Sequence, residues 1–305
     1  MSIRDDITDS IVRLIETGAA RGSSSPLWDA AVSLGLPVNY ATRQAYSGVN
    51  VPLLWGAAQE RGFERNEWLT FKQALALGAS VRKGAKGVLC AFYKMMTRGE
   101  GADAASALAQ SEGAAADGGK GFIPMLKPFW LFNVADIQGL HAGAPVALPF
   151  DPIDRAEELI TRLGVPITWS GTRAFYRPAS DEIFMPSRER FSSTVSAYAV
   201  ALHECVHASG HPSRLAREFG KRFGDDAYAF EELVAELGSA FLVAHLGLPG
   251  ARLEHHASYI ESWLRVLRSH PNAIFTASRH ANAAFQFIVG GLSVDEAADS
   301  ASIAA

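Results

Sequence analysis

Hydrophobic residues recur at helical spacing in several separate stretches of the chain, and this pattern predicts amphipathic helices. The first stretch runs from residue 2 to 17, where Ile3, Ile7, Ile11 and Ile15 fall on one face. The same spacing predicts further helices over about residues 50–61, 71–77, 153–163, 196–209 and 226–246. A glycine directly after several of these stretches marks the end of the helix.

Shorter runs of apolar, aromatic and β-branched residues predict strands over residues 88–94, 122–134, 166–169, 175–177 and 181–186. Between the first two strands, residues 99–121 are rich in Gly, Ala and Ser, which predicts a flexible insertion between paired strands. Glycine and proline cluster again in residues 139–152. We therefore predict an α+β protein of two domains, residues 1–140 and 153–305, joined by a linker at 141–152.

The predicted helix at 196–209 carries the sequence His203-Glu204-Cys205-Val206-His207, which fits the pattern H-E-x-x-H. Residues four apart on a helix lie one above the other, so both imidazoles can bind the same metal ion. Glu204 then lies beside the open coordination position, where it can act as general base on a water molecule. Cys205 points away from both histidines, and we interpret it as a packing residue.

The predicted strand at 181–186 comes shortly before this helix. In metallopeptidases such a strand is the usual edge along which an extended peptide binds, by adding a strand to the sheet. The pattern fits such a peptide-binding edge, and it fits a purely structural sheet edge equally well.

A catalytic zinc site needs a third protein ligand. His211 follows the motif, but the extended pattern H-E-x-x-H-x-x-G-x-x-H would need a histidine at residue 213, which is a serine. The apolar helix at 226–246 offers Glu232 and Glu236, four residues apart on one face. We favour Glu232 as the ligand, with Glu236 accepting a hydrogen bond from a ligand histidine, while the opposite assignment stays open. Glu231 is rotated away, toward the rim of the site.

Composition narrows the class of protein. The 305 residues are 48% hydrophobic, as in a globular protein, and the net charge of −4 gives no overall attraction for nucleic acid. The two cysteines give no disulfide framework and fit a reducing compartment. The first residues are acidic, unlike a secretory signal, and no apolar run reaches the length of a membrane span. We expect a cytoplasmic protein with no membrane partner.

Basic residues are concentrated in the N-terminal half. Between residues 39 and 98, nine basic residues stand against three acidic ones, with eight aromatic residues interspersed. Such a stretch can bind single-stranded nucleic acid, with phosphates on the cations and bases stacked on the rings. Alternatively, the aromatic residues form a core beneath a solvated charged face, and the residues alone slightly favour this second interpretation.

Several motifs together resemble the ArdC-type antirestriction proteins of conjugative plasmids and related mobile elements. In the N-terminal half they are Gly35-Leu-Pro-Val-Asn39, Tyr46-Ser-Gly-Val-Asn50, Trp68-Leu-Thr-Phe-Lys-Gln73 and Val81-Arg-Lys-Gly-Ala-Lys-Gly87. In the C-terminal half they are Asp181-Glu-Ile-Phe-Met-Pro186, His203 to His207, Gly210-His-Pro-Ser-Arg-Leu215 and Glu231-Glu-Leu-Val-Ala-Glu236, followed by His256, Tyr259 and Trp263.

The resemblance implies a single-stranded DNA-binding domain followed by a zincin-like metallopeptidase domain, and protection of incoming plasmid DNA from host restriction. DNA binding thereby becomes the favoured interpretation of the basic stretch. The residues expected to contact DNA are Arg43, Tyr46, Trp68, Lys72, Arg82, Lys83 and Lys86.

In the second domain we expect His203, His207 and Glu232 to bind Zn²⁺, or another divalent ion such as Mn²⁺, with Glu204 as general base for peptide hydrolysis. Tyr259 or His256 would stabilise the oxyanion, or else pack in the core. The substrate is an unknown protein or peptide, with the host restriction machinery as one candidate. Two alternatives stay open, a non-hydrolytic metal-bound shield and, less favoured, a nuclease.

Overall fold

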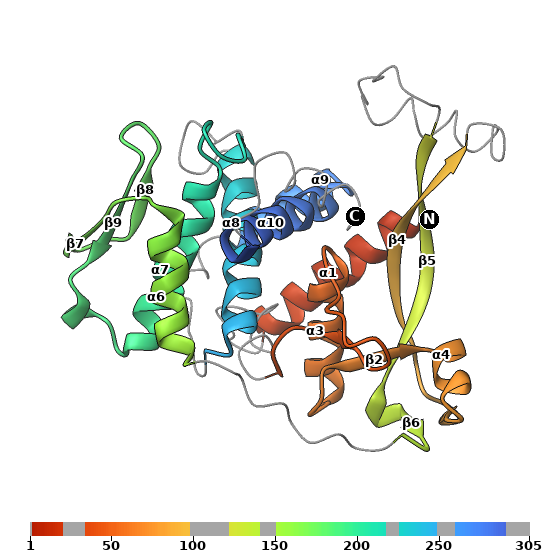
Figure 1. The fold of residues 1–305 in the computed structure, drawn as a ribbon. Helices are drawn as coiled ribbons and strands as arrows, with labels where there is room; N and C mark the ends of the chain where they lie inside the picture. Colours follow the sequence, from red (N-terminus) through yellow and green to blue (C-terminus); the bar gives the residue numbers. More distant parts are fainter. Residues whose placement is uncertain are drawn as a thin grey trace.

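The computed structural model describes residues 2–20, 34–97, 122–140, 151–217, 226–248 and 260–290 (Figure 1). Its helices are α1 (Ile3–Ala20), α3 (Asn50–Arg61), α4 (Phe71–Ala76), α6 (Pro152–Leu163), α7 (Thr194–Ser209), α8 (Asp226–Leu246), α9 (Ile260–Ser269) and α10 (Ala273–Gly290). Its strands are β1 (Val38–Asn39), β2 (Glu67–Thr70), β3 (Ser80–Val81), β4 (Val88–Thr97), β5 (Phe122–Asn133), β6 (Ile137–Gln138), β7 (Ile167–Gly171), β8 (Phe175–Arg177) and β9 (Glu182–Pro186).

The N-terminal half is built on a four-stranded sheet in the order β1-β2-β5-β4. Strands β4 and β5 pair antiparallel from Val88 opposite Leu131 to Thr97 opposite Phe122. The prediction that residues 99–121 interrupt a pair of strands is therefore confirmed, while the segment itself lies outside the described residues. The linker predicted at 141–152 falls almost entirely outside them as well.

Helix α3 packs against this sheet, and a buried asparagine fixes its register. The side-chain amide of Asn50 donates to the Ala91 carbonyl over 2.8 Å, and its oxygen accepts from the Ala91 N–H over 3.0 Å. The pair satisfies both backbone groups of Ala91 on the buried side of β4, where an unpaired group would be costly.

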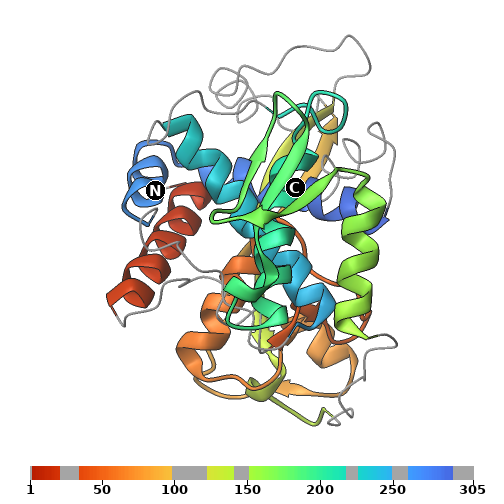
Figure 2. The same ribbon diagram turned by 90° about the vertical axis from the view of Figure 1, so that its left-hand side faces the viewer.

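The C-terminal half has a three-stranded sheet in the order β7-β9-β8, lying beside α7 (Figure 2). The expectation that β9, the strand preceding the H-E-x-x-H helix, is an edge along which an extended peptide binds is wrong. Strand β9 is the central strand and pairs with β7 on one side and β8 on the other. Both backbone edges of β9 are thus already occupied, and β7 and β8 are the edge strands.

Helices α7 and α8 pack against each other at close range. Helix α7 begins where the Ser193 hydroxyl accepts a hydrogen bond from the Ser196 N–H, as expected for a serine N-cap. At the contact, a Cβ atom added to Gly238 would lie 2.9 Å from both Cγ atoms of Val206. The glycine therefore allows the two helices to approach closely enough for side chains of both to meet.

The two halves share one continuous hydrophobic core, and α8 stands at its centre between α7 and the N-terminal helices (Figure 1). The buried Trp55 of α3 contacts Phe241 of α8 with ring centroids 5.8 Å apart, and its indole N–H donates to the Gly35 carbonyl over 2.9 Å. Helix α1 adds a second contact, because the Thr8 hydroxyl donates to the Pro271 carbonyl over 2.7 Å.

Most of the predicted helices and strands are confirmed, with ends that differ by a few residues. Helix α10 was not predicted, although it packs directly on α8 and buries Ile274, Ala277, Ala281, Phe285 and Ile288. Among the helices that the structure describes, each is too short or too polar to span a lipid bilayer.

Because the core is continuous, we expect the two halves to unfold together. Replacing Trp55 with Ala should lower the free energy of unfolding by about 3–5 kcal/mol, since it leaves a cavity between α3 and α8. Urea denaturation should show one transition, with amides of β5 and α7 losing protection from hydrogen exchange at the same urea concentration.

Leu75→Ala is the control for this substitution, because Leu75 is 53% exposed on α4 and its truncation should change stability by only about 0.5 kcal/mol. Two separate transitions in the wild-type protein would contradict the shared core.

Candidate functional site

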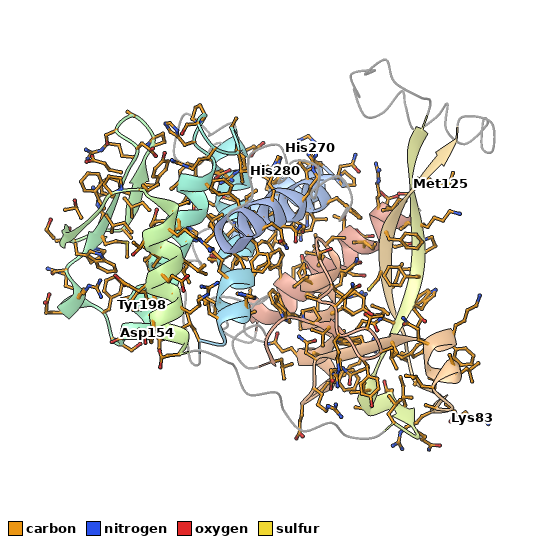
Figure 3. All side chains as sticks on the ribbon, viewed as in Figure 1. Lys83, Met125, Asp154, Tyr198, His270 and His280 are labelled. Carbon is orange, nitrogen blue, oxygen red and sulfur yellow. The ribbon has the colours of Figure 1, made fainter. Side chains whose placement is uncertain are left out.

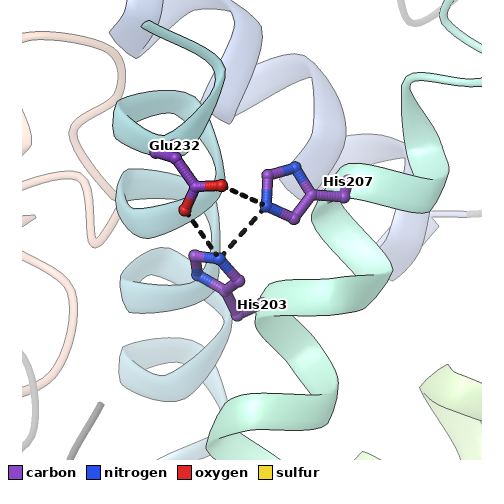
Figure 4. Close-up of side chains that lie close together, drawn as sticks. All are labelled: His203, His207 and Glu232. Atoms are coloured by element: carbon purple, nitrogen blue, oxygen red, sulfur yellow. Dashed lines mark hydrogen bonds and ion pairs between the residues drawn. The ribbon is translucent and has the colours of Figure 1, made fainter. Parts of the chain in front are cut away.

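His203 and His207 of α7 meet Glu232 of α8 (Figure 4). The two Nε2 atoms lie 3.2 Å apart, and the two carboxylate oxygens of Glu232 each lie 3.6 Å from one of them. One ligand atom from each residue lies within 4.8 Å of the others, which is the arrangement of a three-residue metal site. The ring positions follow from the four-residue spacing on α7, and the position of Glu232 follows from the close packing of α8.

The cluster is buried, and its carboxylates favour a cation between the rings. Burial by itself lowers the pKa of His203, but hydrogen bonds to Glu232 and Glu236 and the nearby Glu204 raise it well above the usual range. Burial raises the pKa of Glu232, but the two histidines lower it more, to about 2. A bound divalent ion would supply the positive charge in place of protons.

Glu204 lies beside the two histidines on α7 and is also buried. Burial raises the pKa of its carboxyl group above the ordinary value, while His203, His207 and a backbone hydrogen bond from Tyr176 lower it in part. A carboxyl group with a raised pKa, next to a candidate metal position, suits a general base. The backbone contact places the edge strand β8 next to this carboxyl group.

Glu236 lies on the other side of His203 from Glu232. Its carboxylate is fully buried and lies 3.6 Å from His203 Nδ1, the ring nitrogen that faces away from the cluster. A carboxylate in this position fixes the ring so that Nε2 points inward.

The expectation that Glu231 lies at the rim of the site is wrong. Glu231 is buried, with Oε1 3.3 Å from His207 Nδ1 and both oxygens in contact with the guanidinium of Arg217. Arg217 was not predicted as a site residue, because it lies in an irregular turn after α7 and no motif marks it.

The remaining residues near the motif have other roles. Cys205 is fully buried, which confirms that it is a packing residue. His211 lies beyond the end of α7 with Nδ1 2.7 Å from the Ser213 hydroxyl. Tyr259 and His256, the residues predicted to stabilise an oxyanion, lie outside the described residues.

The basic residues predicted to contact DNA lie on the surface of the N-terminal half. Lys72, Arg82, Lys83 and Lys86 are exposed. Lys83 projects from the outer end of this half, on the far side from α6 and α7 (Figure 3). Arg43 is partly engaged, since its guanidinium pairs with Glu67 and lies over the Tyr40 ring at 5.1 Å.

The two aromatic residues predicted to stack on bases, Trp68 and Tyr46, are less accessible to a ligand than the lysines. Trp68 is fully buried, and its indole N–H donates to Asn66 over 2.8 Å, so it presents no face to a ligand in this conformation. The expectation of stacking on Trp68 is therefore wrong for this structure, and the alternative of a core role applies. Tyr46 is partly buried, accepts a hydrogen bond from Asn39 over 3.0 Å, and burial raises its pKa to about 12.

Two other aromatic residues of the N-terminal half are exposed, and one of them lies next to the basic turn at residues 82–87. Trp130 of β5 is 55% exposed and Phe71 of α4 is 51% exposed. Phe71 directly follows Thr70, the last residue of β2, and Thr70 pairs with Leu131, the neighbour of Trp130 on β5. A Cβ atom added to Gly87 would lie 3.3 Å from the Trp130 side chain, so this tryptophan lies directly beside the turn that carries the lysines. Phe71 is among the aromatic residues interspersed in the basic stretch, whereas Trp130 was predicted only as part of a strand.

Two family models match the chain and together cover most of it. Residues 1–132 match the N-terminal domain of anti-restriction factor ArdC, and residues 154–280 match a zincin-like metallopeptidase.

Three relatives are similar to most of this chain. The protein named y4eC of Sinorhizobium fredii is 40% identical over 280 residues, which is 92% of this chain and 89% of that protein. Two DNA primases TraC of Escherichia coli are 36% and 34% identical over 83% of this chain. The matched part makes up only 18% and 24% of those primases.

The structure is also similar to two crystal structures of the antirestriction protein ArdC from plasmid R388, one bound to Mn(II) and one metal-free. Both match with a TM-score of 0.74 and 32% identity, and they cover 95% and 98% of this chain and 98% and 99% of the known chains. The predicted α+β architecture of two domains is thereby confirmed. The chain belongs to the ArdC family of antirestriction proteins, with an ArdC N-terminal domain followed by a zincin-like metallopeptidase domain.

Proposed function

We propose that this antirestriction protein binds single-stranded DNA through its N-terminal half and hydrolyses peptide bonds at a divalent metal site in its C-terminal half. The observation that carries the second part is the convergence of His203, His207 and Glu232 beside the buried Glu204. The ArdC protein of plasmid R388 has been crystallised with Mn(II), which supports the proposal that this chain binds a divalent ion.

His203, His207 and Glu232 would hold Zn²⁺ or Mn²⁺, through imidazole and carboxylate ligands that both ions accept. A bound ion would supply Lewis-acid polarisation of the peptide carbonyl. Glu204 would take a proton from the attacking water and deliver it to the leaving amine, since it is the buried carboxyl group next to the ligands. Glu236 would hold the ring of His203 in place.

The DNA part of the proposal rests on exposed cations and exposed aromatic rings in the N-terminal half. Lys72, Lys83 and Lys86 would contact phosphates, while Trp130 and Phe71 would provide the stacking faces that the buried Trp68 cannot. Arg82 lies in the same turn as Lys83 and Lys86. Arg43 and Tyr46 would contribute less, because both are already engaged within the protein.

A non-hydrolytic shield is the second candidate function, because the metal site could also serve only to hold α7 and α8 together. Under that proposal the protein would protect incoming DNA by covering it.

The peptide substrate of the first proposal would be a protein that encounters the DNA, with the host restriction machinery as one candidate.

Glu204→Gln should separate hydrolysis from metal binding. The amide cannot accept the proton, so the rate of cleavage of an unstructured test protein in the presence of Zn²⁺ or Mn²⁺ should fall by about 10²- to 10⁴-fold. Metal content should stay at the wild-type level, because the three ligands are unchanged, and His203→Ala is the control that loses the metal.

The same Glu204→Gln variant should be tested for protection of DNA that enters a restricting host. Loss of protection, with metal and DNA binding intact, would support hydrolysis as the basis of antirestriction. Full protection would favour the shield.

Trp130→Ala should weaken the binding of single-stranded oligonucleotides by about 5- to 150-fold, the contribution of one stacked base. Fluorescence anisotropy at fixed salt measures the dissociation constant. Phe175→Ala is the matched control, because Phe175 is an exposed ring on β8 in the other half and should leave DNA affinity unchanged. Equal affinity of the Trp130→Ala variant and the wild type would exclude stacking on this ring.

Replacing both Lys83 and Lys86 with Gln should reduce the salt dependence of DNA binding. For single strands, removing one lysine that binds a phosphate lowers the slope of log K against log salt concentration by about 0.7, so the pair should lower it by about 1.4. An unchanged slope would place the phosphates elsewhere on the protein.

A further inference from the structure

We propose that Arg217 and Glu231 form a buried pair that positions His207 for the metal. Each histidine of the motif then has its Nδ1 atom next to a different glutamate of α8, Glu231 for His207 and Glu236 for His203. The inference rests on the proposed metal site and extends it to residues outside the H-E-x-x-H motif.

The guanidinium of Arg217 is almost completely buried and donates four hydrogen bonds. Two of them form a fork on Glu231, from Nε to Oε2 over 3.1 Å and from Nη2 to Oε1 over 2.8 Å. The others go from Nη1 to the Ser209 hydroxyl over 2.9 Å and from Nη2 to the Val206 carbonyl over 2.6 Å. The arginine therefore anchors Glu231 to the C-terminal turn of α7, the helix that carries both histidines.

The anchored carboxylate reaches a candidate metal ligand. Oε1 of Glu231 lies 3.3 Å from His207 Nδ1, while His207 Nε2 faces Glu232 at 3.6 Å. With Nδ1–H donating to Glu231, the lone pair of Nε2 points into the cluster, which is the tautomer that a metal needs. Glu236 stands in the same relation to His203, at 3.6 Å from its Nδ1. The three glutamates of α8 thus divide into one candidate ligand and two supports.

Stability alone is a weak reason for this pair. Replacing a buried ion pair with apolar residues of similar size is often neutral or stabilising, because desolvation of the two charges offsets their attraction. An apolar pair could fill the space between α7 and α8, but it would give His207 no acceptor. The feature that an apolar pair cannot replace is the contact with the ring.

The turn after α7 also supplies a matched control. Arg214 donates to the Ala208 carbonyl over 2.8 Å and pairs with Asp181 in the turn between β8 and β9, with 3.0 Å from Nη1 to Oδ2. Like Arg217, it joins the end of α7 to another element through a carboxylate. The partners that the structure describes for Arg214 do not include His203, His207 or Glu232.

The test compares Zn²⁺ affinity, measured by competition with a chelator, among the wild type, Glu231→Gln, the double variant Arg217→Met with Glu231→Leu, and Arg214→Met. We expect Zn²⁺ binding to be about 10- to 100-fold weaker in Glu231→Gln and in the double variant, and unchanged in Arg214→Met. The visible absorption spectrum of bound Co²⁺ should change in the same two variants, because the orientation of His207 changes.

The melting temperature of each metal-free variant shows whether it is folded. The double variant leaves no buried charge unpaired and should stay folded even where Glu231→Gln does not. If the folded double variant binds Zn²⁺ as tightly as the wild type, with the same Co²⁺ spectrum, the positioning pair is disproved and the metal site stands. If the wild type itself binds neither Zn²⁺ nor Mn²⁺, both the site and the pair are disproved.

Discussion

The structure depends on the burial of charged groups between α7 and α8. Helix α8 is apolar over most of its length, yet it places Glu231, Glu232 and Glu236 in the interior. Unpaired carboxylates there would be strongly unfavourable, so each must face an imidazole or a guanidinium. The partners come from α7 and the turn behind it, and the close approach at Gly238 brings them within reach. The site and the packing of these two helices are therefore one arrangement, and neither can shift without leaving a buried charge unpaired.

The opposite end of α8 ties this arrangement to the N-terminal half. Phe241 packs on Trp55, and a Cβ atom added to Gly35 would lie 3.6 Å from the Ala244 carbonyl oxygen, so the first half is built directly against the helix. The proposed surface for DNA and the candidate metal site are thus carried on one packed body. Lys83 lies on the far side of this body from Asp154 of α6 and Tyr198 of α7 (Figure 3).

The sequence predicts what depends on local spacing and fails where distant segments decide. The H-E-x-x-H spacing places His203 and His207 together on any helix, and an apolar helix with glutamates leaves few candidates for a third ligand. The central position of β9 depends on β7 and β8 pairing with it from both sides, which no local pattern records. Similarly, Trp68 and Trp130 lie on neighbouring strands of one sheet, yet Trp68 is fully buried and Trp130 is exposed, a difference that no local pattern records.

The position of Glu204 favours hydrolysis over a shield. A site that only holds two helices together needs ligands and the groups that orient them, and Glu232, Glu236 and Glu231 fill those roles. Glu204 is not needed for any of them, yet it is buried next to the histidines with a pKa raised by that burial. Keeping a fourth carboxyl group at such a place costs stability, because its charged form is desolvated. A proton acceptor beside a Lewis acid is the role that accounts for this cost.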